Sequence, residues 1–334
     1  MFAELTQQGI AVPDVAPDFA EAVATRLEEI ETRLGDAAAS ATPFVTEAAQ
    51  HIISAGGKRF RPLLVVLAAH LGHPTADEVV RAALVVELTH VASLYHDDVM
   101  DDADLRRGAA SANRRWDNTV AILVGDFLFA RASSIVATLG TDYVALQADT
   151  FARLVQGQIA ETLGPQAGED PLSHYLSVVA DKTGSLIATS AVFGGMVAGA
   201  TPEVLDALAR YGEEIGVVFQ LSDDIIDITS DDSGKTPGTD LREGVPTLPT
   251  LLARQSTDPA DARLLALLDA DLSADVGLAA EALALMRSHH SLADARAEIT
   301  RRAEVARGFL APLPEGPAKD ALAALCDTVI SRSA

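Results

Sequence analysis

The chain has little positive charge, few aromatic residues and one cysteine. Its 334 residues include 25 Lys and Arg against 48 Asp and Glu, which gives a formal net charge of −23. This charge argues against binding nucleic acid or an anionic membrane through a broad basic surface. Cys326 has no partner for a disulfide within the chain, and we expect it in the core. The sequence begins without the basic start and apolar run of a signal peptide, so we expect a cytoplasmic protein.

Aromatic residues make up 4% of the chain and hydrophobic residues 49%, mostly Ala, Leu and Val, a composition that favours helices over sheets. Apolar residues recur at helical spacing, and no strand-like alternation stands out. We therefore expect an all-α protein with one domain over residues 1–334, a bundle of ten or more helices. The expected helices cover 17–37, 75–90, 118–140, 142–164, 204–229, 274–290, 291–310 and 318–332, with loops near 168–171, 229–244 and 255–261.

Residues 183–202 (TGSLIATSAVFGGMVAGATP) carry no charge over a length that could span a bilayer. The segment is interrupted by Gly, Ser and Thr, which is typical of a helix buried in a large bundle. We therefore expect a buried helix there and no membrane-spanning segment.

Two acidic clusters with the same D-D-x-x-D spacing each follow a long apolar helical run. The first aspartate motif is Asp97, Asp98 and Asp101, and the second is Asp223, Asp224 and Asp227. Like charges four residues apart on a helix repel each other, which points to a compensating cation. Ligand sets made only of oxygen select hard cations such as Mg²⁺, which binds through a few carboxylates together with substrate phosphates. The pair of motifs therefore predicts Mg²⁺-assisted binding of a diphosphate.

Basic residues lie in short segments near these motifs. Arg106 and Arg107 follow the first motif, and Lys235 lies in a Gly-rich loop after the second. Only four lysines occur in the chain, and three of them lie in such segments: Lys58 with Arg61 in GGKRFRP, Lys182 in ADKTG, and Lys235. His90 lies two helical turns before Asp97 on the same face, as either a core histidine or part of the site.

The segments GGKRFRP, LYHDDVMDDADLRRG, KT, FQLSDDIID and GKTPGTDLREG together resemble the trans-isoprenyl diphosphate synthases, or polyprenyl synthetases. This resemblance implies an isoprenoid-synthase fold around a central cavity, a homodimer, and three Mg²⁺ ions held by the two aspartate motifs. It also implies two groups of substrate-binding residues. The resemblance assigns isopentenyl diphosphate to Lys58, Arg61, His90 and Arg107, and the allylic diphosphate to Arg106, Lys182, Thr183, Gln220 and Lys235.

The implied reaction is a head-to-tail condensation. Mg²⁺ and the basic residues stabilise the departing diphosphate, and the isopentenyl double bond attacks the resulting allylic cation. Lys182 is expected to take part at the reacting centre. Many members of the family have a further Lys where this chain has Val245, which removes one contact to the allylic diphosphate.

Small residues precede the first aspartate motif and predict an open tunnel for a long product. Ala92 and Ser93 lie five and four residues before Asp97, and the tunnel is expected to continue along Thr89, Val86 and Val85. Eleven residues of helix give about 16 Å, which predicts a product of roughly six to ten isoprene units, as in quinone side chains. Phe127 and Phe129 are the expected deeper floor.

Three other functions stay open at this stage. One is a synthase with a shorter product, geranylgeranyl or farnesyl diphosphate, and another is a subunit of a heteromeric synthase. The third, a terpene cyclase, is disfavoured because a cyclase has no use for the second diphosphate pocket that GGKRFRP implies.

Overall fold

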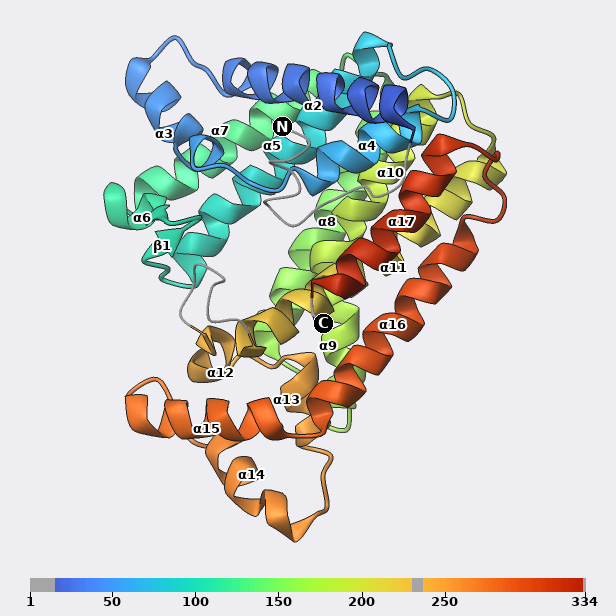
Figure 1. Ribbon diagram of the computed structural model, residues 1–334. Helices are drawn as coiled ribbons and strands as arrows, with labels where there is room; N and C mark the ends of the chain where they lie inside the picture. The colour runs from blue at the N-terminus through green and yellow to red at the C-terminus, as the bar shows by residue number, and fades with distance from the viewer. Residues whose placement is uncertain (1–15, 230–236, 333–334) are drawn as a thin grey trace. The chain divides into compact units, whose positions relative to one another are not determined.

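The computed structural model describes residues 16–229 and 237–332, and it is built almost entirely of helices (Figure 1). In these residues the only strands are two short ones that pair as an antiparallel hairpin, β1 (Leu105–Arg106) and β2 (Ala109–Ala110). The all-α prediction is confirmed.

The chain divides into two compact units. The first consists of the residues up to Ala152, Leu186–Gly212 and Phe309–Leu325, and the second of Arg153–Ser185, Glu213–Gly308 and the residues from Cys326 onward. That the whole chain forms a single domain stays a prediction.

The first unit is organised around α5, which packs against α2, α4 and α7. Its helices are α2 (Pro17–Ala37), α3 (Pro43–Ser54), α4 (Phe60–Ala69), α5 (Asp77–Met100), α6 (Ala112–Arg115), α7 (Asn118–Val136) and nearly all of α10 (Ser185–Val197). It also contains the first parts of α8 (Thr141–Leu163), α11 (Pro202–Thr229) and α17 (Pro317–Ser331). Nearly every residue of α4 is buried, so this helix is part of the core on all its sides.

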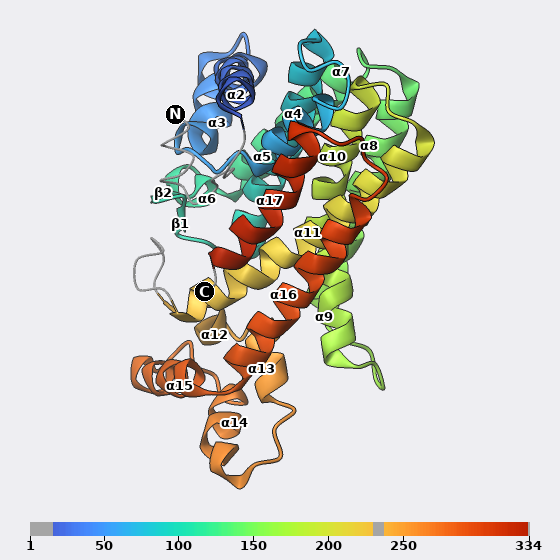
Figure 2. The same cartoon turned by 45° about the vertical axis from the view of Figure 1, so that its right-hand side comes forward.

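The second unit contains the later parts of α8, α11 and α17 and a set of shorter helices. These are α9 (Pro171–Val179), the π-helix η1 (Ala180–Gly184), α12 (Thr239–Glu243), α13 (Leu248–Ala253), the 3₁₀-helix η2 (Pro259–Asp261), α14 (Ala262–Leu268), α15 (Val276–Ser288) and α16 (Ser291–Phe309). Helices α14 and α15 pack side by side, as both views show (Figure 2). Their apolar faces share a core with Ile228 at the end of α11.

Three expectations about the elements can be compared with the structure. The uncharged segment forms the end of η1 and the largely buried α10, as expected. The expected loop at 229–244 is wrong in part, because α12 lies within it. Among the described residues, the helix that is long and apolar enough to span a membrane is α7, of which 33% of the most apolar window is buried. The absence of a membrane-spanning segment therefore stays a prediction.

Candidate active site

In the first unit, the loop that leads into α4 is held by a buried arginine. Arg59 has a left-handed backbone (φ 48°) and donates from Nε to Glu31 at 2.6 Å and from Nη1 to Glu87 at 2.9 Å. Its side chain and that of Glu87 are both almost fully buried. Arg59 therefore fixes the loop to α2 and α5, and so fixes the positions of its neighbours Lys58 and Arg61.

In this unit, Arg61, His90 and Arg107 interact electrostatically, and Glu87 lies close to both arginines. We call Lys58, Arg61, His90 and Arg107 the basic cluster. Desolvation lowers the pKa of Arg61 to about 10, an effect that Glu87 opposes and Arg107 reinforces. Desolvation, followed by the charges of Arg61 and Arg107, holds the pKa of His90 well below its ordinary value. At neutral pH the arginines are therefore charged and His90 is neutral, which suits a site for an anion.

The guanidinium group of Arg107 packs closely against Gly57 in the GGKRFRP loop. Arg107 has φ 54° in the hairpin turn and donates from Nη1 to the carbonyl oxygens of Gly56 and Ile52, the latter at 3.1 Å. A Cβ added at Gly57 would lie 2.8 Å from Cζ of Arg107 and 2.7 Å from Nη1 of Arg59. Gly57 is therefore needed for the two guanidinium groups to pack against the loop.

The first aspartate motif lies at the C-terminal end of α5, and its three acids face different surroundings. Asp97 is half-buried, whereas Asp101 is exposed. Asp101 is the C-cap residue of α5, and its backbone N–H donates a hydrogen bond to the carbonyl oxygen of Asp97. Asp98 is fully buried and its Oδ1 accepts from Nε and Nη2 of Arg106, at 2.7 and 2.5 Å. Burial raises the pKa of Asp98 and Arg106 opposes that shift.

In the second unit, the middle acid of the second motif also points into the protein. Asp224 is 2% exposed and accepts from the Tyr175 hydroxyl, from the backbone N–H of Leu248 at 3.1 Å and from Nε2 of Gln220 at 3.3 Å. Burial raises its pKa to about 7, against the lowering effect of the Tyr175 hydrogen bond. Asp224 therefore links α11 to α9 and α13.

The flanking acids of the second motif have different partners. Asp223 is 39% exposed and its Oδ1 accepts from Nη2 of Arg332 at 2.6 Å. The Arg332 guanidinium also lies over the ring of Phe219, one helical turn before Asp223. Asp227 accepts the backbone N–H of Asp240 at 3.2 Å and thereby positions the start of α12.

Lys182 and Thr183 lie in the π-helix η1, a kind of distortion that is frequent at functional sites. Nζ of Lys182 is 2.5 Å from Oε2 of Glu161 on α8, and the hydroxyl of Thr183 donates to Oε1 of Gln220 at 3.5 Å. The structure thus brings Lys182, Thr183, Gln220 and Asp224 together in one unit. Lys235 lies outside the described residues.

The predicted chain-length residues lie in the first unit. Ala92 and Val86 are completely buried in α5, and the half-buried Ser93 donates to the carbonyl of His90. Phe127 and Phe129 are both half-buried on α7. The ring of Phe129 lies 5.7 Å from that of His96, the residue before Asp97. The role of Phe127 and Phe129 as a deeper floor stays a prediction.

The donor set of the two motifs fits a hard divalent cation. All six side chains offer carboxylate oxygens, the ligands that Mg²⁺ prefers. Oδ2 of Asp98 is buried and has no hydrogen-bond partner, which leaves one oxygen of that acid for a cation. Asp97, Asp101 and Asp223 retain solvent exposure, whereas protein donors occupy Asp224.

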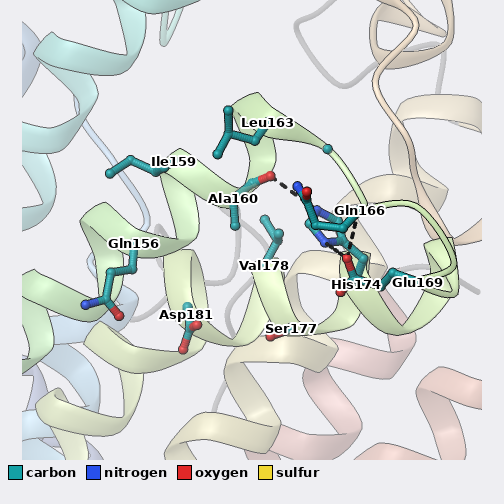
Figure 3. A pocket seen from close by; sticks show the side chains of 11 residues that line it. Gln156, Ile159, Ala160, Leu163, Gln166, Glu169, His174, Ser177, Val178 and Asp181 are labelled. Atoms are coloured by element: carbon teal, nitrogen blue, oxygen red, sulfur yellow. Dashed lines mark hydrogen bonds and ion pairs between the residues drawn. The ribbon is translucent and has the colours of Figure 1, made fainter.

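A separate pocket of about 360 Å³ lies in the second unit, where the end of α8 meets α9 (Figure 3). Ile159 and Leu163 form an apolar side, and His174 lies opposite, 3.3 Å from Glu169. None of the lining residues is Lys or Arg, so the pocket is not suited to a diphosphate.

Asp261, His289 and His290 form another group of possible metal ligands in the second unit. Nδ1 of His289 accepts the backbone N–H of Ser291 at 3.1 Å, so the proton of the neutral ring is on Nε2, which faces Asp261. With the proton on Nε2, this nitrogen is not available to a metal ion, and the group does not carry a metal site.

With this geometry established, comparison with known proteins gives a single family. Residues 42–286 match the family model described as polyprenyl synthetase. The chain belongs to the polyprenyl synthetase family. A nonaprenyl diphosphate synthase of Mycobacterium tuberculosis (strain ATCC 25618 / H37Rv) is 48% identical over 317 residues, which cover 94% of each chain.

Solved structures of other polyprenyl synthetases have the same all-α fold. A geranylgeranyl pyrophosphate synthase from Corynebacterium glutamicum, complexed with calcium and isoprenyl diphosphate, matches with a TM-score of 0.86 and 42% identity, covering 96% of this chain and 99% of that one. A decaprenyl diphosphate synthase from Rhodobacter capsulatus matches with a TM-score of 0.86 and 32% identity, covering 95% and 99%. The expected isoprenoid-synthase fold is therefore confirmed.

Several residues that organise the site were missed in the sequence. Glu87 pairs with Arg59 beside the basic cluster, Glu161 pairs with Lys182, Tyr175 holds Asp224, and Arg332 holds Asp223. Glu87 had a visible signal, since it is the only charged residue between Arg81 and His90 in the apolar run of α5. The other three contacts join residues 21 to 109 positions apart, and no local pattern marks them.

Proposed function

We propose that this polyprenyl synthetase is a Mg²⁺-dependent trans-prenyltransferase that condenses isopentenyl diphosphate with an allylic diphosphate. The observation that carries the proposal is that each aspartate motif shares its unit with groups suited to bind a diphosphate. The first unit places the basic cluster near the first motif, and the second unit places Lys182, Thr183 and Gln220 near the second. We propose that both sets serve one reaction.

The basic cluster is proposed to bind isopentenyl diphosphate. The guanidinium groups of Arg61 and Arg107 keep their charge at neutral pH, and the neutral His90 offers a hydrogen bond without adding charge. Bidentate arginine contacts suit a phosphate well. Arg59 is proposed to hold the loop and not the substrate, because Glu31, Glu87 and two carbonyls already take its donors.

The allylic diphosphate is proposed to lie against Arg106, Lys182, Thr183, Gln220 and Lys235, with the Mg²⁺ ions, three by family resemblance, held by the aspartates. Bound Mg²⁺ would neutralise charge on the departing diphosphate. We propose Asp97, Asp101, Asp223 and Asp227 as the main ligands. Asp98 remains a proposed ligand through Oδ2, while its Oδ1 orients Arg106. Asp224 also remains a proposed ligand, but both of its oxygens accept hydrogen bonds, so it would have to exchange one of them for the cation.

The proposed product is long, roughly six to ten units, because the turns of α5 before Asp97 present small side chains. The similar nonaprenyl and decaprenyl synthases support this length, and the similar geranylgeranyl synthase keeps the shorter product as the second candidate. In a Ser93→Phe variant the new ring is expected to fill the wall beside the motif and shorten the product. Unchanged product lengths by mass spectrometry would show that Ser93 does not line the tunnel.

We further propose a cytoplasmic homodimer. Two large apolar side chains of α7, Ile122 at 43% and Leu123 at 61%, are exposed in the first unit. Exposed apolar surface of this kind marks contact sites, and the charge of −23 disfavours an anionic membrane as the partner. Light scattering of the purified protein should give twice the mass of one chain. A measured mass equal to that of one chain would reject the dimer.

The metal-dependent site can be tested without turnover. Inorganic diphosphate with Mg²⁺ should stabilise the protein against thermal unfolding, by about 2.7 kcal/mol at one hundred times the dissociation constant. Asp97→Asn and Asp223→Asn should each reduce this stabilisation. Asp149→Asn, an exposed acid on α8, is the control and should retain it. Equal stabilisation without Mg²⁺, or in all three variants, would contradict the proposed site.

A further inference from the structure

The apolar interior of the first unit contains two polar pairs that join helices. Nε2 of Gln147 on α8 donates to the hydroxyl of Thr89 on α5 at 3.3 Å. The hydroxyls of Thr150 on α8 and Thr189 on α10 are 2.5 Å apart. All four side chains are buried. Buried polar groups are found with partners, and here the partners are each other.

Ring contacts show how α8 runs past α5. The ring of Phe151 on α8 lies 4.3 Å from that of Phe129 on α7, and Phe129 in turn lies 5.7 Å from His96, the residue before Asp97. Phe151 is therefore near the level of the first aspartate motif. One turn earlier on α8, Gln147 is level with Thr89, two turns earlier on α5. The two helices thus run in the same direction along the proposed path of the product.

The position of the Gln147–Thr89 pair can be compared with the expected tunnel. Thr89 lies eight residues before Asp97, about 12 Å along the helix axis. A chain that grows from the first motif along Ser93 and Ala92 would next reach Thr89. The side chain of Gln147 contacts α5 at this depth.

We propose that Gln147 is a specificity-determining residue that narrows the product tunnel beside Thr89, and this inference rests on the proposed function. The hydrogen bond to Thr89 holds the amide in place. A prenyl chain that passes this point must separate the amide from the hydroxyl, and it offers no hydrogen bond in return, so both groups would be left buried without partners. Release of the product therefore competes with elongation once the chain reaches Gln147.

Gln147→Ala tests this assignment. The purified variant and the wild type are incubated with Mg²⁺, isopentenyl diphosphate and one allylic primer, and the product ladders are compared by mass spectrometry. The truncation opens space beside Thr89, so the longest product should gain at least about one five-carbon unit. Gln147→Leu retains most of the volume of the side chain but loses the hydrogen bond to Thr89, so its ladder should lengthen by less than that of Gln147→Ala.

Gln156→Ala is the matched control, because Gln156 lies on the same helix but is exposed, and its ladder should equal that of the wild type. An unchanged ladder in Gln147→Ala, or the same lengthening in Gln147→Leu, would overturn the assignment. If Gln147→Ala does not fold, Gln147→Ser removes similar volume and decides by the same criterion. Absence of product in the wild type would instead reject the proposed function.

Discussion

A methyl group at Gly157 would occupy space that the backbone of η1 already fills. The Cβ of an alanine there would lie 2.7 Å from the backbone nitrogen of Lys182 and 3.0 Å from Cβ of Asp181. Backbone atoms cannot rotate away as a flexible side chain can, so α8 and η1 must move apart by several tenths of an ångström. We expect Gly157→Ala to destabilise the protein by about 1–3 kcal/mol, the usual cost of overpacking.

The catalytic effect of this change should exceed its effect on stability. Lys182 and Thr183 lie on the displaced backbone, and a misplacement near 1 Å at a reacting centre costs on the order of a hundredfold in rate. We expect kcat to fall by about ten- to a hundredfold. The KM for isopentenyl diphosphate should change little, because the residues proposed to bind it belong to the loop before α4, to α4 and α5, and to the β1–β2 turn.

Steady-state kinetics with each substrate varied in turn, together with thermal unfolding, measure both effects. Gly308→Ala is the control, since it places a methyl group on helix α16 with no atom within 4 Å. It should leave the kinetics unchanged and alter stability by less than about 1 kcal/mol. A Gly157→Ala enzyme with the kcat of the wild type would refute the argument that close packing of α8 positions Lys182.

Two further predictions concern buried charges. Arg59→Met leaves Glu87 buried without its partner and should lower the free energy of unfolding, measured by chemical denaturation, by about 3–5 kcal/mol. Arg33→Met removes a more exposed pair with Asp77 and should lower it by less than about 1 kcal/mol. Equal losses in the two variants would contradict the role of Arg59 in holding the loop. Asp224 has a pKa raised from 3.8 to about 7 in the folded protein, so folding favours its protonated form. The protonated Asp224 carboxyl therefore makes its full contribution to stability below pH 3.8. As the pH rises towards 7 this contribution is lost, which lowers the free energy of unfolding by up to about 4 kcal/mol. In metal-free protein, Asp224→Asn should flatten the decline of the unfolding free energy between about pH 4 and 7, and parallel curves for variant and wild type would contradict the burial argument.

The sequence predicted the elements whose signal is local. The amphipathic stretches of α2, α11 and α16, and the repeated aspartate spacing at the ends of α5 and α11, are visible without tertiary information. Helix α4 was not predicted, because it is buried on all sides and its sequence LLVVLAA has no periodic polar face. Helix α9 was also missed, although Asp170 caps it and Pro171 begins it, because the surrounding Gly and Pro residues indicated a loop.

The candidate site shows the same division between local and long-range information. The spacing predicted which acids form the motifs, but it did not predict which of their side chains point into the protein. Adjacent residues on a helix point about 100° apart. Asp97 and Asp98, or Asp223 and Asp224, therefore cannot face the same point, and the structure shows which member of each pair turns inward. Tyr175 and Arg332 decide this for the second motif, and they come from α9 and from the residue after α17, far along the chain from Asp223 and Asp224.

The measurement that tests the central claim most directly is an incubation of the purified protein with Mg²⁺, isopentenyl diphosphate and separate allylic primers, followed by mass spectrometry of the products. The account predicts a ladder that requires Mg²⁺ and ends at roughly six to ten isoprene units. A ladder that stops at three or four units would preserve the reaction and reject the open tunnel along α5. No product with any primer would contradict the proposed activity of the chain on its own.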